Sequence, residues 1–224
     1  MITILSIETA TKNCSVSLSV DGQLIECREI AEENFSHAEK LHVFVEEVLK
    51  DNGKSLKDLS AIAISQGPGS YTGLRIGVSS AKGLCYGLSI PMIALDTLEV
   101  LARQINVEGG LIIPMLDARR MEVFSAVFDS TYNKIAPIEA VVVDENSFAD
   151  YSQTNTLHLI GDGALKCKEV LNGDNFIYYP ENIYPSAKEM CSMAHSKFLA
   201  NDFVDVAYFE PFYLKDFVLI TKKK

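Results

Sequence analysis

One order of elements occurs twice along this chain, and it restricts the folds that the chain can adopt. In its first occurrence, an apolar run at residues 2–8 is followed by two alternating segments, Ser15–Val20 and Gln23–Ile30. The Asp21-Gly22 pair between these segments is a strong signal for a two-residue hairpin turn. A buried strand, a hairpin and then a helix together predict a mixed sheet in an α/β protein.

The same order returns in the second part of the chain. Leu111–Leu116 is an apolar run, and Glu122–Phe128 and Lys134–Val143 follow it as two strand-like segments around a turn. The repetition predicts two related α/β halves with mixed sheets. We expect the boundary near residue 106, so that one half comprises residues 1–106 and the other residues 107–224.

The remaining elements connect these strands. We expect further strands at residues 59–65, 91–95 and 156–160, and helices at residues 36–51, 71–87, from residue 97, at residues 164–171 and at residues 186–200. Ser36 and Glu39 have the spacing of a capping box at the start of the first helix.

The segment Ser65–Gly77 joins a buried strand to a helix and reads Ser-Gln-Gly-Pro-Gly-Ser-Tyr-Thr-Gly-Leu-Arg-Ile-Gly. Free backbone N–H groups at a helix N-terminus, together with the helix dipole, can bind an anion. Gly67 and Gly69 are therefore candidates for contact with a phosphate. The spacing differs from the known nucleotide fingerprints, because Gly67-x-Gly69-x-x-x-Gly73 has one residue too many and no Gly-Lys-Ser/Thr is present.

Four small residues of this region, Gly69, Gly73, Gly77 and Ala81, stand four positions apart. On a helix they form a ridge that lets another backbone approach closely. The ridge has two interpretations. It packs inside the chain, or it contacts a phosphate or a partner chain.

Acidic residues follow strands in both halves. Glu8 and Asp117 each end an apolar strand, and ligands of α/β sheets bind at this edge. The pair could hold Mg²⁺ on a nucleotide phosphate, or each carboxylate could cap its own turn. Gly161, Asp162 and Gly163 could likewise contact a nucleotide, or Asp162 could form an Asx-turn.

The residues present disfavour several classes of function. His37 and His42 diverge on a helix, and the other two histidines are isolated, so no His-Glu-x-x-His metal motif exists. The five cysteines form no Cys-x-x-Cys pair, and their odd number indicates a reducing compartment. Ser70 has Pro68 at the position where a nucleophile elbow needs glycine.

Charge and hydropathy restrict the kinds of partner that the chain can bind directly. The formal net charge is −10, whereas an RNA-binding surface needs a positive footprint, so we expect RNA only as an indirect partner. No window approaches the roughly 18 consecutive apolar residues of a membrane span. The first residues carry no basic region of a signal peptide. The sequence therefore predicts a cytoplasmic protein without a membrane partner.

The segment Gly67–Gly77 resembles the signature of the TsaB (YeaZ) family, a bacterial family of the tRNA threonylcarbamoyladenosine (t6A) pathway with an older glycoprotease (peptidase M22) label. The resemblance extends along the chain and includes Ile4–Leu18, Ser36–Leu41 and Glu210–Lys215, with Glu8 where the family usually has Asp. It implies the duplicated actin-like ATPase fold, which is also that of sugar kinases, Hsp70-like and ribonuclease H-like proteins.

The resemblance also implies a function. TsaB proteins support TsaD, which transfers the threonylcarbamoyl group to N6 of adenosine 37 in tRNA, as a non-catalytic partner and dimerisation platform. TsaE is the ATPase of that complex. TsaD carries a His-x-x-x-His metal pair where this chain has Thr97 and Leu101. We therefore expect no enzymatic activity, no metal site and no required cofactor, with ATP or ADP and Mg²⁺ only at the interface of the complex.

By resemblance, TsaB proteins pair through their first two helices, with TsaD or as a homodimer. This places a partner interface at six residues of this chain: Leu41, Val45, Tyr71, Gly73, Gly77 and Ala81. An alternative from another class is a free-standing ATP-dependent phosphotransferase of the sugar-kinase fold, which would use Glu8, Asp117 and the Gly67–Gly73 loop. Turnover of ATP by the chain alone would distinguish the two.

Overall fold

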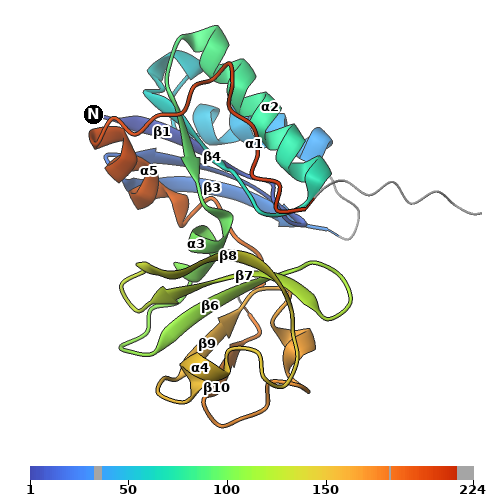
Figure 1. Ribbon diagram of the computed structural model, residues 1–224. Coiled ribbons are helices and arrows are strands. Elements are labelled where there is room, and N and C mark those ends of the chain that lie inside the picture. Colours follow the sequence, from blue (N-terminus) through green and yellow to red (C-terminus); the bar gives the residue numbers. More distant parts are fainter. Residues whose placement is uncertain (33–36, 182, 216–224) are drawn as a thin grey trace, which may run out of the picture.

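The computed structural model describes residues 1–32, 37–181 and 183–215 and contains two five-stranded mixed sheets (Figure 1). The first sheet has the order β3-β2-β1-β4-β5, with β1 (Thr3–Glu8), β2 (Asn13–Val20), β3 (Gln23–Ala31), β4 (Ala61–Ser65) and β5 (Met92–Leu95). The second has the order β10-β9-β6-β7-β8, with β6 (Leu111–Asp117), β7 (Glu122–Asp129), β8 (Lys134–Val142), β9 (Leu157–Ile160) and β10 (Phe176–Tyr179).

Both sheets have the same topology. In each, three strands form an antiparallel meander, β1-β2-β3 or β6-β7-β8, and two strands join in parallel, β4 and β5 or β9 and β10. The first hairpin turns at Asp21 and Gly22, which both have positive φ, as a two-residue turn of this kind requires. The order that recurs in the sequence is therefore a recurring fold.

The helices are α1 (His37–Lys50), α2 (Tyr71–Leu88), α3 (Thr97–Ala102), α4 (Ala149–Ser152) and α5 (Met190–Leu199), with 3-10 turns at Leu56–Asp58 and Leu165–Cys167. The predicted cap Ser36 lies outside the described residues. The prediction of a helix at residues 164–171 was wrong. This segment makes only tight turns. In this conformation Ala164, Cys167 and Leu171 all pack into the core of the second sheet. Within the described residues, none of the helices combines the length and the apolar character needed to cross a bilayer.

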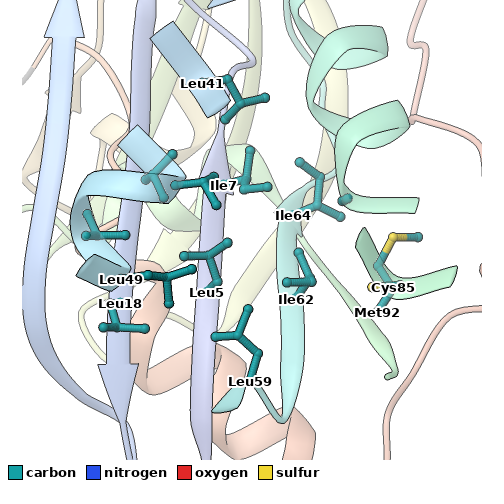
Figure 2. Packing of buried hydrophobic residues seen from close by; sticks show 14 of the residues in the cluster. Leu5, Ile7, Leu18, Leu41, Leu49, Leu59, Ile62, Ile64, Cys85 and Met92 are labelled. Atoms are coloured by element: carbon teal, nitrogen blue, oxygen red, sulfur yellow. The ribbon is translucent and has the colours of Figure 1, made fainter. Parts of the chain in front are cut away.

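The two faces of the first sheet carry side chains of different size. Large apolar side chains face α1 and α2, and Figure 2 shows this layer, which includes Leu5, Ile7, Leu18, Ile62 and Ile64. The opposite face carries mostly small side chains on β1, β2 and β4, namely Ser6, Ser15, Ser17, Ser19, Ala61, Ala63 and Ser65, together with the larger Ile4, Ile93 and Leu95. This small-residue face lets α5 pack closely, and the hydroxyl of Ser17 donates to the carbonyl of Ala187 at 2.7 Å.

α3 lies between the two sheets (Figure 1). Val100 packs with the first sheet and α5, whereas Leu98 and Leu101 pack on the second sheet. Asp96 caps the helix by accepting from the N–H of Leu98 at 2.9 Å, and its carboxylate also pairs with Lys134 of β8. This six-residue helix therefore contacts both halves.

The chain returns to the first half after the second sheet is complete. α5 covers the small-residue face, and residues 203–215, which we call the C-terminal strap, then pass along α2. Val204 N–H donates to Met92 O of β5 at 3.0 Å. Lys82 of α2 donates to the carbonyls of Ala207 and Phe209 at 3.0 and 3.1 Å. The strands of the first sheet thus precede residue 106 in the sequence, and those of the second sheet follow it. The division into residues 1–106 and 107–224 stays a prediction.

Candidate functional site

The small-residue ridge of α2 lies inside the chain. At Gly69, Gly73 and Gly77, a Cβ atom would come closer than 3.0 Å to an atom of Thr9 or Ala10, in the turn between β1 and β2. The Thr9 hydroxyl also donates to Gly73 O at 2.8 Å. The ridge therefore holds this turn against α2, which is the internal interpretation of the pattern.

The apolar residues named for a partner interface have similar surroundings. Leu41, Val45 and Ala81 belong to the core between the first sheet, α1 and α2. Tyr71 is half-buried at the start of α2. A partner that approaches these helices therefore meets their outer residues rather than the ridge.

A second row of small residues lies on the solvent side of α2. Ser79, Gly83 and Gly87 stand four positions apart and are exposed. A Cβ atom at Gly83 or Gly87 would have no other atom within 4 Å. Tyr86 beside them is 86% exposed. We call Ser79, Gly83, Tyr86 and Gly87 the outer α2 surface. The lack of side-chain bulk at its three small residues leaves the helix open to close approach beside Tyr86.

Glu8 is fully buried at the end of β1. One carboxylate oxygen accepts from the N–H of Ala10 at 2.6 Å, so the side chain caps its own turn. Burial raises the pKa of Glu8 to about 7, and the charge of Glu189, just before α5, adds to the rise. Burial likewise raises the pKa of Glu189 to about 7. Glu8 therefore faces α5 and not a solvent-filled site.

A cleft of about 660 Å³ opens between the two halves. Its first wall is the β1–β2 turn with the start of α2, and its second wall follows the end of β6. The polar, aromatic and glycine residues that line it are Thr11, Lys12, Gly69, Ser70, Tyr71, Thr72, Asp117, Arg119, Phe124 and Asp162. Of the seven residues predicted to bind a cofactor, Gly69, Asp117 and Asp162 line this cleft.

The two aspartates of the cleft are linked to each other. The N–H of Asp117 donates to the carboxylate of Asp162 at 2.9 Å, and Lys166 pairs with the carboxylate of Asp117. Burial raises the pKa of Asp162 to about 6, and the charge of Asp117 adds to the rise, whereas Lys166 and Lys12 oppose it. The cleft thus contains two carboxylates with basic side chains around them.

The other glycines predicted to bind a cofactor pack against the chain itself. A Cβ atom at Gly67, Gly161 or Gly163 would come closer than 3.0 Å to a neighbouring atom, which for Gly67 is the carbonyl oxygen of Phe212 in the strap. Gly67 and Gly161 also have φ values of +112° and +111°, which glycine adopts without steric cost. These three residues do not line the cleft.

By the resemblance, Thr97 and Leu101 occupy the positions of metal-binding histidines. Both side chains make contacts within the chain. The hydroxyl oxygen of Thr97 accepts from the N–H of Gly67 at 2.9 Å and bonds to the hydroxyl of Ser65. Leu101 is fully buried between α3 and the second sheet. In the part of the chain that the structure describes, no three His, Cys, Asp or Glu side chains are grouped so that they could hold a metal ion.

The sequence did not predict that the strap contacts Tyr71, a residue of the cleft wall, and Glu122 of β7. The ring of Tyr213 packs on Tyr71 with centroids 5.0 Å apart, and the Arg75 guanidinium lies 4.2 Å from the Tyr71 centroid. Lys215 continues to Glu122 of β7. The late motif included in the resemblance is the sequence signal for this segment, but a motif does not say which distant residue it contacts.

Comparison with known proteins identifies relatives of the chain. The model of the family described as TsaD, tRNA N6-adenosine threonylcarbamoyltransferase, matches residues 29–217. The tRNA threonylcarbamoyladenosine biosynthesis protein TsaB of Escherichia coli is 32% identical over 220 residues, which cover 95% of this chain and 94% of the relative. The protein of the same name from Bacillus subtilis is 37% identical over 144 residues, 64% of this chain and 61% of the relative.

Solved structures share the architecture. YeaZ from Pseudomonas aeruginosa matches with a TM-score of 0.83 and 24% identity, over 96% of this chain and 100% of that one. The ethanolamine utilization protein EutJ from Carboxydothermus hydrogenoformans matches with a TM-score of 0.52 and 10% identity, over 86% of this chain and 90% of that one. The two mixed sheets form the duplicated actin-like ATPase fold, as expected. With both sequence and fold in agreement, the chain belongs to the TsaB (YeaZ) family of tRNA threonylcarbamoyladenosine biosynthesis proteins.

Proposed function

We propose that the chain acts in t6A formation in the cytoplasm as a non-catalytic partner and dimerisation platform of TsaD. The proposal rests on the contacts of Thr97 and Leu101. Thr97 accepts a hydrogen bond from the Gly67 loop, and Leu101 packs in the core. Threonine is a poor metal ligand and leucine is none. Membership in the TsaB family supports a role beside the transferase, and the match to the TsaD family model relates the chain to that transferase.

We place the contact with TsaD on the outer α2 surface. Gly83 and Gly87 present bare backbone to solvent, which allows a partner helix to approach closely. Tyr86 supplies a large exposed ring of the kind that is enriched at interfaces. A groove of about 470 Å³ between α1 and Leu84 lies on the same pair of helices. In this proposal TsaE joins the complex as its ATPase, and tRNA is bound by the complex and not by this chain.

The cleft is the place that we propose for ATP or ADP with Mg²⁺ in the complex. Lys12 and Arg119 offer positive charge to phosphates, and Asp117 and Asp162 offer oxygen atoms to the cation. Glu8 takes no part, because its carboxylate is buried on the turn that it caps. A nucleotide bound there would contact residues of both halves of the chain.

The contact with TsaD can be tested with a matched pair of variants. Gly83→Arg puts a long cation on the outer α2 surface, and Gly109→Arg makes the same change at an exposed glycine that also has open space. We expect Gly83→Arg to abolish co-purification with the TsaD of the same organism and Gly109→Arg to preserve it, with unchanged circular dichroism for both. Binding of TsaD by folded Gly83→Arg would overturn the placement of the contact.

Turnover separates this proposal from a free-standing phosphotransferase, which the cleft would equally suit. We expect no ATP hydrolysis or phosphate transfer by the chain alone, and t6A formation by purified TsaD only after the chain is added. Elemental analysis should find no stoichiometric zinc or iron in the purified chain. ATP turnover without TsaD, or one tightly held transition metal per chain, would contradict the non-catalytic role.

A further inference from the structure

An asparagine or aspartate directly precedes a glycine at four places in the chain: Asp21-Gly22, Asn52-Gly53, Asp162-Gly163 and Asn172-Gly173. At such a pair the backbone nitrogen of the glycine can attack the side-chain carbonyl carbon of the residue before it, because glycine has no Cβ atom to block the approach. For asparagine the product is a cyclic succinimide, and ammonia leaves. This reaction is one reason why asparagine is a thermolabile residue.

In a folded protein, hydrogen bonds decide whether the two reacting groups can meet. The glycine N–H has to give up its proton, and the side chain has to turn toward the glycine nitrogen. A glycine N–H that donates to a backbone carbonyl, or a side chain that is fixed by its own hydrogen bonds, can react only after local opening. The four pairs differ in how firmly they are held in this way.

The pair at the end of α1 is held at both reacting groups. The side-chain amide of Asn52, which is half-buried, donates to Glu26 Oε2 at 2.5 Å and to Val48 O at 2.8 Å. The N–H of Gly53 donates to Lys50 O at 3.1 Å. Three hydrogen bonds therefore have to open before the nitrogen of Gly53 can attack.

The two aspartate pairs are also held. At Asp162-Gly163, the glycine N–H donates to Met115 O at 2.9 Å, and the carboxylate accepts from the N–H of Asp117 at 2.9 Å. At Asp21-Gly22, the carboxylate accepts from the N–H of Ile2 at 2.7 Å. An ionised carboxylate is in addition a poorer electrophile than an amide, because it has no neutral group to release.

The fourth pair lacks these restraints. Asn172 and Gly173 are both exposed, in the connection that leads to β10. The side-chain amide of Asn172 makes one hydrogen bond, to Glu169 O at 3.2 Å. Among the residues that the structure describes, none accepts a hydrogen bond from the N–H of Gly173. Its nitrogen is therefore free to attack, in the kind of exposed loop that opens at little cost.

We propose that Asn172-Gly173 is a site of deamidation in the folded chain and that the other three pairs are protected. The nitrogen of Gly173 loses its proton to solvent and bonds to Cγ of Asn172, and the bond from Cγ to Nδ2 breaks as ammonia leaves. Water then opens the ring at either carbonyl, which gives aspartate or isoaspartate. The sequence consumes only water and involves no change of oxidation state. It does not depend on a role beside TsaD.

The products differ from the parent chain in charge and in length. Each event puts a new carboxylate beside Glu169 and Asp174, on a chain that already has a net charge of −10. Isoaspartate also adds one carbon atom to the main chain just before β10, which is tied to β9 by the hydrogen bond from Leu157 N to Asn175 O at 2.7 Å. The isoaspartyl carboxylate is the group that methyltransferases of the protein-repair class recognise, so this loop is the site at which such an enzyme would act on an aged copy.

The test compares the two asparagine pairs in one sample. The purified full chain is kept at mildly alkaline pH, and tryptic peptides from successive times are analysed by mass spectrometry and by labelling with an isoaspartate methyltransferase. We expect conversion at Asn172 to be at least about tenfold faster than at Asn52, because several hydrogen bonds hold Asn52. In urea, where these bonds are lost, the two rates should become similar.

Gly173→Val provides the matched variant. A Cβ atom at Gly173 would meet nothing closer than 3.5 Å, so we expect unchanged circular dichroism, while the branched side chain blocks the attacking nitrogen and suppresses conversion at Asn172. Three results would overturn the proposal. They are an intact Asn172 in the folded chain when the chain in urea converts, equal rates at Asn52 and Asn172 in the folded chain, and undiminished conversion in folded Gly173→Val.

Discussion

Gly73 and Gly83 occupy one helix, and their surroundings predict opposite effects of the same substitution. We expect Gly73→Ala to lower the free energy of unfolding by at least about 1–3 kcal/mol, because its Cβ would collide with the backbone of Thr9. Gly83→Ala should raise it by about 0.5–1 kcal/mol, because the new methyl has open space and alanine favours the helix. Urea unfolding of both variants measures the difference. Equal effects would show that the ridge is not packed as described.

Glu8 makes stability depend on pH. Its pKa is about 7 in the folded chain against an ordinary value of 4.5, so the folded state holds the proton more tightly. The resulting stabilisation is complete below about pH 4.5 and is lost as the pH rises to about 7; for this buried group it is on the order of 3 kcal/mol. Glu8→Gln, which stays neutral, should flatten this part of the curve of unfolding free energy against pH. A variant curve parallel to that of the parent chain would refute the assignment.

The candidate site could be predicted only in part at the level of residues. Asp117, Asp162 and Gly69 were predicted because strand ends and helix starts meet at one edge of a sheet, and they line the cleft. Glu8 has the same pattern, but its contacts come from the far end of the chain, where Glu189 and α5 cover it. No local spacing reveals such a cover.

At the scale of elements, the cap residue of α3 also takes part in the contact between the halves. Asp96→Ala removes the cap of α3 and should lower the free energy of unfolding by about 1–2 kcal/mol. Asp96→Asn keeps a capping oxygen and loses only the ion pair with Lys134, so we expect a smaller loss. Thermal unfolding of the two variants separates the cap from the link between halves. If Asn is as damaging as Ala, the ion pair and not the cap stabilises α3.

Most elements were predictable because their signals are local. The Asp21-Gly22 turn fixes the first hairpin, and the apolar period of α1 and α2 gives their extent to within a residue or two. β10 was missed, and the helix expected at residues 164–171 is a run of turns. Both lie where the second sheet decides the conformation, because Cys167 and Leu171 are drawn into its core.

At the scale of the whole molecule, the net charge of the chain determines how well it binds RNA directly. The chain carries a net charge of −10, so we expect the isolated protein to bind tRNA no better than the non-specific range of roughly 10⁻⁴ M at physiological salt. Filter binding at two salt concentrations measures this, with the complex with TsaD as the positive control. Nanomolar binding by the chain alone would contradict an indirect role.

The path of the strap and α5 has a consequence for synthesis on the ribosome. Ile4 and Ala63 emerge early, but Met190 and Ala194, which complete their core, are made only after all strands of the second sheet. Because chains are delivered from the N-terminus, the second half has emerged in full before the first half can close. A ribosome that stalls before α5 therefore releases a protein whose first sheet lacks its cover, and chaperones or proteases meet that open face first.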